Sequence, residues 1–144
     1  MLVNRRTVRI EWAHCDIAAI VFYPRYFEMF DTSTHYLFEK AGWKKRELIR
    51  AFDIVGYPMV DTRAKFLVPS TAGDDVVIET NVTEFRNSSF DVEHKVFKPG
   101  PDGEVLAIEG FETRVWVAKH PDDPNRIKSR PIPEEVIRRL SATC

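Results

Sequence analysis

The sequence predicts an α+β fold in which an antiparallel sheet of about five strands packs on one long central helix. Two observations carry this prediction. Only one long stretch has apolar residues at helical spacing, while five stretches have the alternation or composition of β-strands. Three of those strands follow one another with turns between them, as in an antiparallel meander. The chain of 144 residues is expected to form one domain, residues 1–144.

The first part of the chain is predicted to run from a strand into the long helix. Val8, Ile10 and Trp12 alternate with charged residues, so residues 7–13 are expected to form a half-buried strand. Pro24 suits a first helical turn and Gly42 a helix end, which predicts a helix of about 17 residues between them. Its apolar stripe consists of Phe27, Phe30, Thr34, Leu37 and Ala41. Residues 44–52 are expected to form a short second helix.

The remaining chain is predicted to be mostly strands. Strands are expected over residues 59–68, 76–85, 86–97 and 104–118, with turns at 69–75 and 98–103. Alternation is clearest around Val76 and Ile78. Residues 120–133, rich in Pro and Asp, are expected to be a loop, and residues 133–140 a short C-terminal helix.

Composition excludes several classes of protein. A net charge of −1 gives no footprint for nucleic acid or an anionic membrane. No apolar run approaches the length of a signal peptide or a membrane span. Cys15 and Cys144 do not resemble a disulfide framework, and free thiols suit a reducing compartment. A cytoplasmic protein is therefore expected.

Asp16 lies between the predicted strand and the long helix, ahead of a run of small and apolar residues. One interpretation is a helix N-cap or a turn residue, since Asp is common at such positions. The other is catalytic, because a helix N-terminus can polarise a carbonyl oxygen while a carboxylate acts on the carbonyl carbon. The residues alone leave both interpretations open.

Asp31 interrupts or borders the aromatic stripe of the long helix. A buried charge is costly unless it is paired or hydrogen-bonded. Asp31 is therefore interpreted either as a stripe-edge residue, solvated or paired with His35 or Arg25, or as a carboxylate that binds a polar group of a ligand.

Other motifs predict neither a metal nor a cofactor. His14 and Asp16 form an H-x-D pair, but no third ligand lies at metal-site spacing. No P-loop, dinucleotide-binding or nucleophile-elbow motif occurs, and no Cys-His-Asn arrangement supports Cys15 as a nucleophile. Residues 85–90 bring an Arg and two hydroxyls together. They are interpreted either as a candidate for a binding site or as an ordinary surface strand.

The segment RIEWAHCDIAAIVFYPRYFEMFD (residues 9–31) resembles the opening of the 4-hydroxybenzoyl-CoA thioesterases, a family with the hotdog fold. Residues 54–80, 84–90 and 112–118 follow in the order of that family, so the resemblance covers roughly residues 5 to 120. It implies a hotdog fold and a thioesterase that hydrolyses an aromatic, hydroxybenzoyl-type acyl-CoA.

The resemblance also implies roles for individual residues. Asp16 matches the catalytic carboxylate, as nucleophile or as general base. Tyr23 matches the residue whose backbone N–H contacts the oxyanion. Asp31 matches the carboxylate near the ring hydroxyl. Phe22 and Phe27 would line the acyl pocket together with Phe30 and Tyr26, while Tyr57 and Pro58 match positions near a junction between two subunits.

The match to the CoA-binding residues is thinner. Arg86, Ser88 and Ser89 stand where the family has a more basic run, and Arg63 and Lys65 are expected to compensate. Ala19 stands where the family usually has Gly, and Ile17 replaces a common Pro.

Two alternative functions remain at this stage. One is hydrolysis of an acyl-carrier-protein thioester, which predicts a basic patch near the pocket, with Arg5, Arg6, Lys44, Lys45 and Arg46 as candidates. The other is a non-catalytic hotdog protein that binds acyl ligands. Open sheet edges predict a dimer at least, and the resemblance implies a homotetramer with sites at subunit interfaces.

Overall fold

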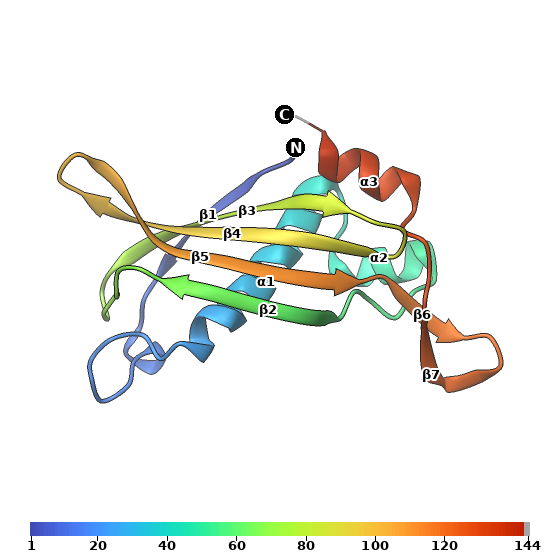
Figure 1. Cartoon of the computed structure of the whole chain (residues 1–144), viewed down its shortest axis with the longest axis horizontal. Helices are drawn as coiled ribbons and strands as arrows, with labels where there is room; N and C mark the ends of the chain where they lie inside the picture. Colours follow the sequence, from blue (N-terminus) through green and yellow to red (C-terminus); the bar gives the residue numbers. More distant parts are fainter. Residues whose placement is uncertain (143–144) are drawn as a thin grey trace.

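A five-stranded antiparallel sheet lies against one long helix in the computed structural model, which describes residues 1–142 (Figure 1). The strands are β1 (Asn4–Arg9), β2 (Met59–Phe66), β3 (Asp75–Phe85), β4 (Ser89–Gly100) and β5 (Gly103–Val115). Their order across the sheet is β1-β3-β4-β5-β2, and each neighbouring pair is antiparallel. The predicted fold class and the meander of β3, β4 and β5 are confirmed.

The long helix α1 (Pro24–Ala41) begins and ends where the sequence predicts. Pro24 is its first residue, and Gly42 ends it in the left-handed conformation with φ 119°. The helix crosses one face of the sheet closely because β5 carries Gly110 beneath it. A Cβ on Gly110 would lie 2.6 Å from the ring of Phe30 on α1, so only Gly allows this contact.

Two apolar clusters fill the space between the helices and the sheet. One surrounds Phe30, Ile78 and Ile108 beneath the first half of α1. The other surrounds Leu37 and Trp116, and it also anchors α2 (Lys45–Phe52) and α3 (Glu134–Ser141). No helix among residues 1–142 is both long and apolar enough to cross a membrane.

The structure corrects two predictions at the ends of the sheet. The first strand ends at Arg9, and Trp12 lies in a 3₁₀ turn (Trp12–His14) with 75% of its surface exposed. Residues 120–133 are not simply a loop, because β6 (Val117–His120) and β7 (Asp123–Ser129) form an antiparallel hairpin. Pro and Asp in this segment concealed the hairpin, whose second strand is exposed along nearly its whole length, although Val117 and Ala118 of the first are buried. Cys144 lies outside the described residues.

Candidate active site

Asp16 lies in the loop that joins β1 to α1, and it does not cap the helix. The N-cap position belongs to Tyr23. The Asp16 side chain instead accepts the Ala18 N–H through Oδ1 at 2.9 Å, and the Asp16 N–H donates to the Ile20 carbonyl at 3.1 Å. Asp16 therefore closes a turn in this loop and caps no helix, and its carboxylate remains exposed.

The same loop has a strained residue. Ala19 has φ 64°, a left-handed conformation that costs an L-residue about 1 kcal/mol or more. The loop is nevertheless held, because the Thr71 hydroxyl donates to the Ala19 carbonyl at 2.6 Å and the Val21 N–H donates to the Ser70 carbonyl at 3.0 Å. These bonds fix the loop, and Asp16 with it, against the turn that precedes β3.

The N-terminus of α1 leaves one backbone donor free beside this loop. The N–H groups of Arg25 and Tyr26 donate to the carbonyls of Phe22 and Tyr23, and Pro24 has no N–H. Within residues 1–142, the Tyr23 N–H donates to no carbonyl or side chain. A free N–H at the positive end of a helix can stabilise a developing negative charge on an oxygen.

Asp16 and Tyr23 line one mostly apolar cavity of about 540 Å³. A cavity of this kind, apolar with few polar groups, is typical of small-molecule sites. Its lining comes from the loop, the start of α1, the end of β2, the turn before β3, and β5. Besides Asp16 and Tyr23 it consists of Ile20, Val21, Phe22, Tyr26, Phe66, Val68, Pro69, Ser70 and Ile108. The predicted pocket residue Phe22 is thus brought beside Asp16.

Asp31 is paired with Arg114 of β5. The sequence suggested His35 or Arg25 as the partner, and Asp31 pairs with neither of them. Arg114 Nη2 donates to Asp31 Oδ1 at 2.8 Å, whereas Arg25 pairs with Glu28. The Asp31 side chain is 53% exposed and borders a hollow of about 470 Å³. The predicted pocket residue Phe27 lines the same hollow, together with Met59 at the start of β2.

Tyr23, Phe27 and Asp31 form one ridge along α1, at intervals of four residues. Eight residues of helix separate Tyr23 from Asp31, or about 12 Å at 1.5 Å per residue. A ligand placed between these two residues would form a hydrogen bond of about 3 Å at each end. The remaining length of the roughly 12 Å has room for about one aromatic ring and its substituents. The ring of Phe27 lies between the two ends, with its centroid 6.4 Å from that of Tyr23.

Three buried side chains behind Asp31 were missed by the sequence reasoning: His94, Glu112 and Arg114. Glu112 accepts hydrogen bonds from Arg114 Nε at 3.0 Å and from Thr34, and lies 3.3 Å from His94 Nε2. Burial alone would raise the pKa of Glu112, but His94 and Arg114 outweigh it and lower the pKa to about 2. The sequence did carry a signal for these residues. Glu112 and Arg114 are charged, yet they stand at inward-facing positions between Ile108 and Trp116.

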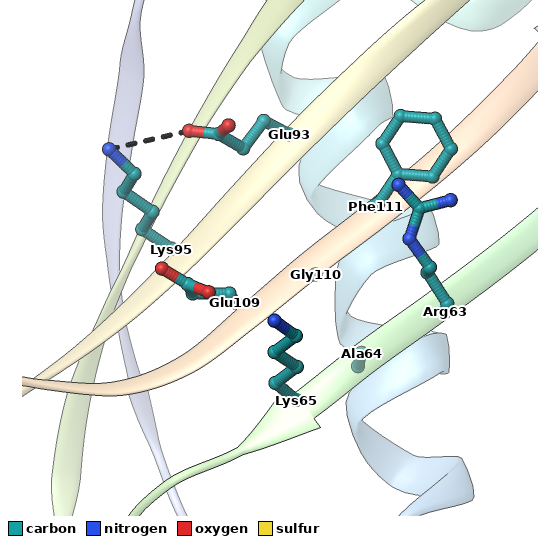
Figure 2. A pocket seen from close by; sticks show the side chains of 8 residues that line it. All are labelled: Arg63, Ala64, Lys65, Glu93, Lys95, Glu109, Gly110 and Phe111. Atoms are coloured by element: carbon teal, nitrogen blue, oxygen red, sulfur yellow. Dashed lines mark ion pairs between the residues drawn. The ribbon is translucent and has the colours of Figure 1, made fainter.

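The predicted CoA-binding residues lie on the other face of the sheet and around its β3–β4 turn. Figure 2 shows Arg63 of β2 against the ring of Phe111, with the Arg63 guanidinium carbon 4.1 Å from the ring centroid. Lys65 lies beside it, facing a hollow of about 270 Å³ floored by Ala64 and Gly110.

Arg86 is already engaged. It donates to both carboxylate oxygens of Asp91, at 3.0 and 2.6 Å, and to Ser89 Oγ at 2.8 Å. The Ser88 carbonyl accepts the Trp116 N–H at 2.7 Å. The structure therefore brings Arg86 and Ser89 together, but around a carboxylate of the chain itself.

Two further groups of predicted residues lie elsewhere. The Tyr57 ring is only 1% exposed and stacks on Phe38 at 4.6 Å, while the adjacent Pro58 is exposed just before β2. The suggested basic patch does not form beside the Asp16 cavity. Arg5 pairs with Glu79 and Glu104 on one face of β1, and Arg6 bonds to α1 on the other. The three remaining cations, Lys44, Lys45 and Arg46, lie at the start of α2, away from this cavity.

Comparison with known proteins agrees with this geometry. The family model described as thioesterase-like superfamily matches residues 8–140. A 4-hydroxybenzoyl-CoA thioesterase from Pseudomonas sp. (strain CBS-3) is 33% identical over 137 residues, which cover 92% of this chain and 94% of that protein.

Solved structures give the same result. An aspartate-to-asparagine variant of 4-hydroxybenzoyl-CoA thioesterase, in complex with 4-hydroxybenzoyl-CoA, superposes with a TM-score of 0.88 and 29% identity, covering 98% of this chain and 100% of that one. A gentisyl-coenzyme A thioesterase superposes with a TM-score of 0.79 and 29% identity, covering 96% of this chain and 100% of that one.

Proposed function

Because the chain belongs to the thioesterase-like superfamily and has the hotdog fold, we propose that it hydrolyses a hydroxybenzoyl-type acyl-CoA to the free acid and CoA. The observation that supports this proposal is that Asp16 and Tyr23, whose N–H has no partner within residues 1–142, line the same apolar cavity. The relatives named above act on hydroxylated aromatic acyl-CoA esters by their names, which supports an aromatic acyl group here.

In the proposed mechanism, the thioester carbonyl oxygen accepts a hydrogen bond from the Tyr23 N–H, which stabilises the charge of the tetrahedral intermediate. By one route, the Asp16 carboxylate attacks the carbonyl carbon and expels the CoA thiolate, and water then hydrolyses the resulting mixed anhydride to release the acid and regenerate Asp16. By the other route, Asp16 takes a proton from the water that attacks the carbonyl carbon and expels the thiolate. The leaving thiolate needs little protonation, since thiols ionise with a pKa of about 8.5. The ring hydroxyl then donates to Asp31, about 12 Å from Tyr23 along the helix.

The proposed site is shared by two subunits. The Asp16 loop is bonded to residues 70–74 at the start of β3, whereas Arg86 follows its far end. The two ends of β3 lie at opposite ends of the sheet (Figure 1). The 11 residues of β3 span roughly 35 Å at about 3.4 Å per residue. One substrate can therefore meet both Asp16 and Arg86 only if Arg86 comes from another subunit.

We expect the second subunit to pair along the outer edge of β2. Its exposed apolar residues Met59, Val60 and Phe66 lie along the outer edge, where residues 1–142 place no further strand. Two copies paired antiparallel about a two-fold axis would place the Met59 end of one strand beside the Phe66 end of the other. Tyr57, Pro58 and Arg86 of the second copy would then lie toward Asp16 of the first.

Ala64→Pro tests this assembly. The Leu67 N–H bonds to Ala107 of β5, so by alternation the Ala64 N–H points away from β5. Proline at this position removes a donor from the outer edge only. Sedimentation velocity at micromolar concentration is expected to show a dimer or larger for the wild type and for Ala64→Ser, and a shift toward monomer with loss of thiol release for Ala64→Pro. A wild-type monomer that hydrolyses thioesters would contradict the shared site.

The role of CoA is tested with two thioesters of the same acid. One is 4-hydroxybenzoyl-CoA, and the other is the N-acetylcysteamine ester, which lacks the nucleotide and its phosphates. We expect kcat/KM to be about 10-fold higher for the CoA ester, with an advantage that shrinks in high salt. Hydrolysis of neither ester would contradict the proposed function. Equal hydrolysis of both would favour an acyl-carrier-protein substrate, an alternative that the engagement of Arg86 by Asp91 supports.

A further inference from the structure

A band of buried polar residues divides the core in two. On successive strands it consists of Thr80, His94, Glu112 and Arg114. On β5, the apolar residue Ile108 precedes the band and belongs to one core cluster, while Trp116, directly after β5, follows the band and belongs to the other. Burying such groups costs free energy unless each finds partners, so the band requires a reason beyond packing.

The band ends at the guanidinium of Arg114, which is buried but is bonded to Asp31 at the surface. The Arg114 side chain is only 5% exposed. Its Nε donates to Glu112 at 3.0 Å, its Nη1 to the Tyr57 carbonyl at 3.3 Å, and its Nη2 to Asp31 Oδ1 at 2.8 Å. The planar fork is thus fixed on the buried side by Glu112, and its remaining edge holds Asp31.

Glu112 is itself held from behind. The Thr34 hydroxyl donates to Glu112 Oε1, and His94, which shares that oxygen, is bonded at Nδ1 to the Thr80 hydroxyl at 2.8 Å. The His94 ring also stacks on Phe30 of α1, with centroids 4.7 Å apart. A continuous chain of contacts therefore runs from β3 to the half-exposed carboxylate of Asp31.

We propose that Arg114 is the positioning residue of Asp31, and that by holding Oδ1 it keeps Oδ2 directed at the ring hydroxyl and so sets how strongly the site prefers a hydroxylated acyl group. With Oδ1 taken by Arg114, Oδ2 has no other partner within residues 1–142 and is the acceptor left for a ligand. A single anionic acceptor pairs with a hydroxyl donor and repels an acyl group that carries its own carboxylate. This inference rests on the proposed function, because it assigns a role within the same site.

The test compares kcat/KM for 4-hydroxybenzoyl-CoA and benzoyl-CoA in Arg114→Met. Because this variant leaves Glu112 buried without its cation, a second variant, Glu112→Gln with Arg114→Met, removes both charges together. Arg139→Met is the matched control, since Arg139 pairs with Glu135 and lies over Trp43, far from Asp31. Circular dichroism and thermal melting establish that each variant is folded.

We expect the ratio of the two kcat/KM values to fall about 10-fold or more in both Arg114 variants. In the double variant, kcat/KM is expected to fall further for 4-hydroxybenzoyl-CoA than for benzoyl-CoA, and Arg139→Met is expected to keep the wild-type ratio. A ratio unchanged in a folded Arg114 variant, or a parallel fall for both esters, would overturn the inference while leaving the proposed function intact. A wild type that hydrolyses neither ester would instead contradict the proposed function.

Discussion

Asp16→Asn is expected to lower kcat for 4-hydroxybenzoyl-CoA by about 10²-fold or more. The asparagine side chain keeps an oxygen that can accept the Ala18 N–H, so the turn that Asp16 closes at 2.9 Å is preserved. What is lost is the negative charge needed for attack on the carbonyl or on water. The measurement is free-thiol release under saturating substrate, with a thermal melt to compare stability.

Asp122→Asn provides the matched control, because Asp122 lies in the turn of the β6–β7 hairpin and lines no cavity with Asp16. Its kcat is expected to equal that of the wild type. An Asp16→Asn enzyme with wild-type kcat would reduce Asp16 to a turn residue and favour a non-catalytic, acyl-binding protein.

Asp31→Ala is expected to abolish most of the preference for a hydroxylated ring. We expect the kcat/KM ratio of 4-hydroxybenzoyl-CoA to benzoyl-CoA to fall about 10- to 100-fold. The limit of about 10⁴-fold applies to a polar group that stays fully buried when unpaired, but the Asp31 side chain is 53% exposed in the single chain. Water can therefore replace part of the missing contact with the ring hydroxyl.

Glu39→Ala is the control for Asp31→Ala, since Glu39 is an exposed residue near the other end of α1. It is expected to leave the ratio unchanged. A ratio that survives in Asp31→Ala would mean that the ring hydroxyl is recognised elsewhere, and the cavity that Asp16 shares with Tyr26 and Ser70 would be the next place to look.

The parts of the fold that could be predicted are those set by local signals. Pro24 and Gly42 mark the ends of α1 by backbone geometry alone, and alternation identifies β3 because one face of that strand is buried. The β6–β7 hairpin was missed because β7 is exposed along nearly its whole length and carries no apolar alternation.

The site was predictable where it depends on neighbouring residues and not where it depends on strand register. Asp16, Tyr23 and Phe22 lie within eight residues of one another, so the loop brings them together. The pairing of Asp31 with Arg114 requires knowing that β5 passes beneath α1, a contact across 83 residues. The same holds for Glu112, whose partner His94 comes from β4.

Asp16 and Asp31 are proposed to act on one substrate, a hydroxylated aromatic acyl-CoA whose thioester lies at Asp16 and whose hydroxyl reaches Asp31. The most direct test measures kcat/KM of the wild-type protein for 4-hydroxybenzoyl-, 3-hydroxybenzoyl-, benzoyl- and short aliphatic CoA esters in one thiol-release assay. We expect the highest value for 4-hydroxybenzoyl-CoA, an intermediate value for benzoyl-CoA and the lowest for the aliphatic esters. Equal values across the panel, or a preference for the aliphatic esters, would contradict the roles proposed for Asp16 and Asp31.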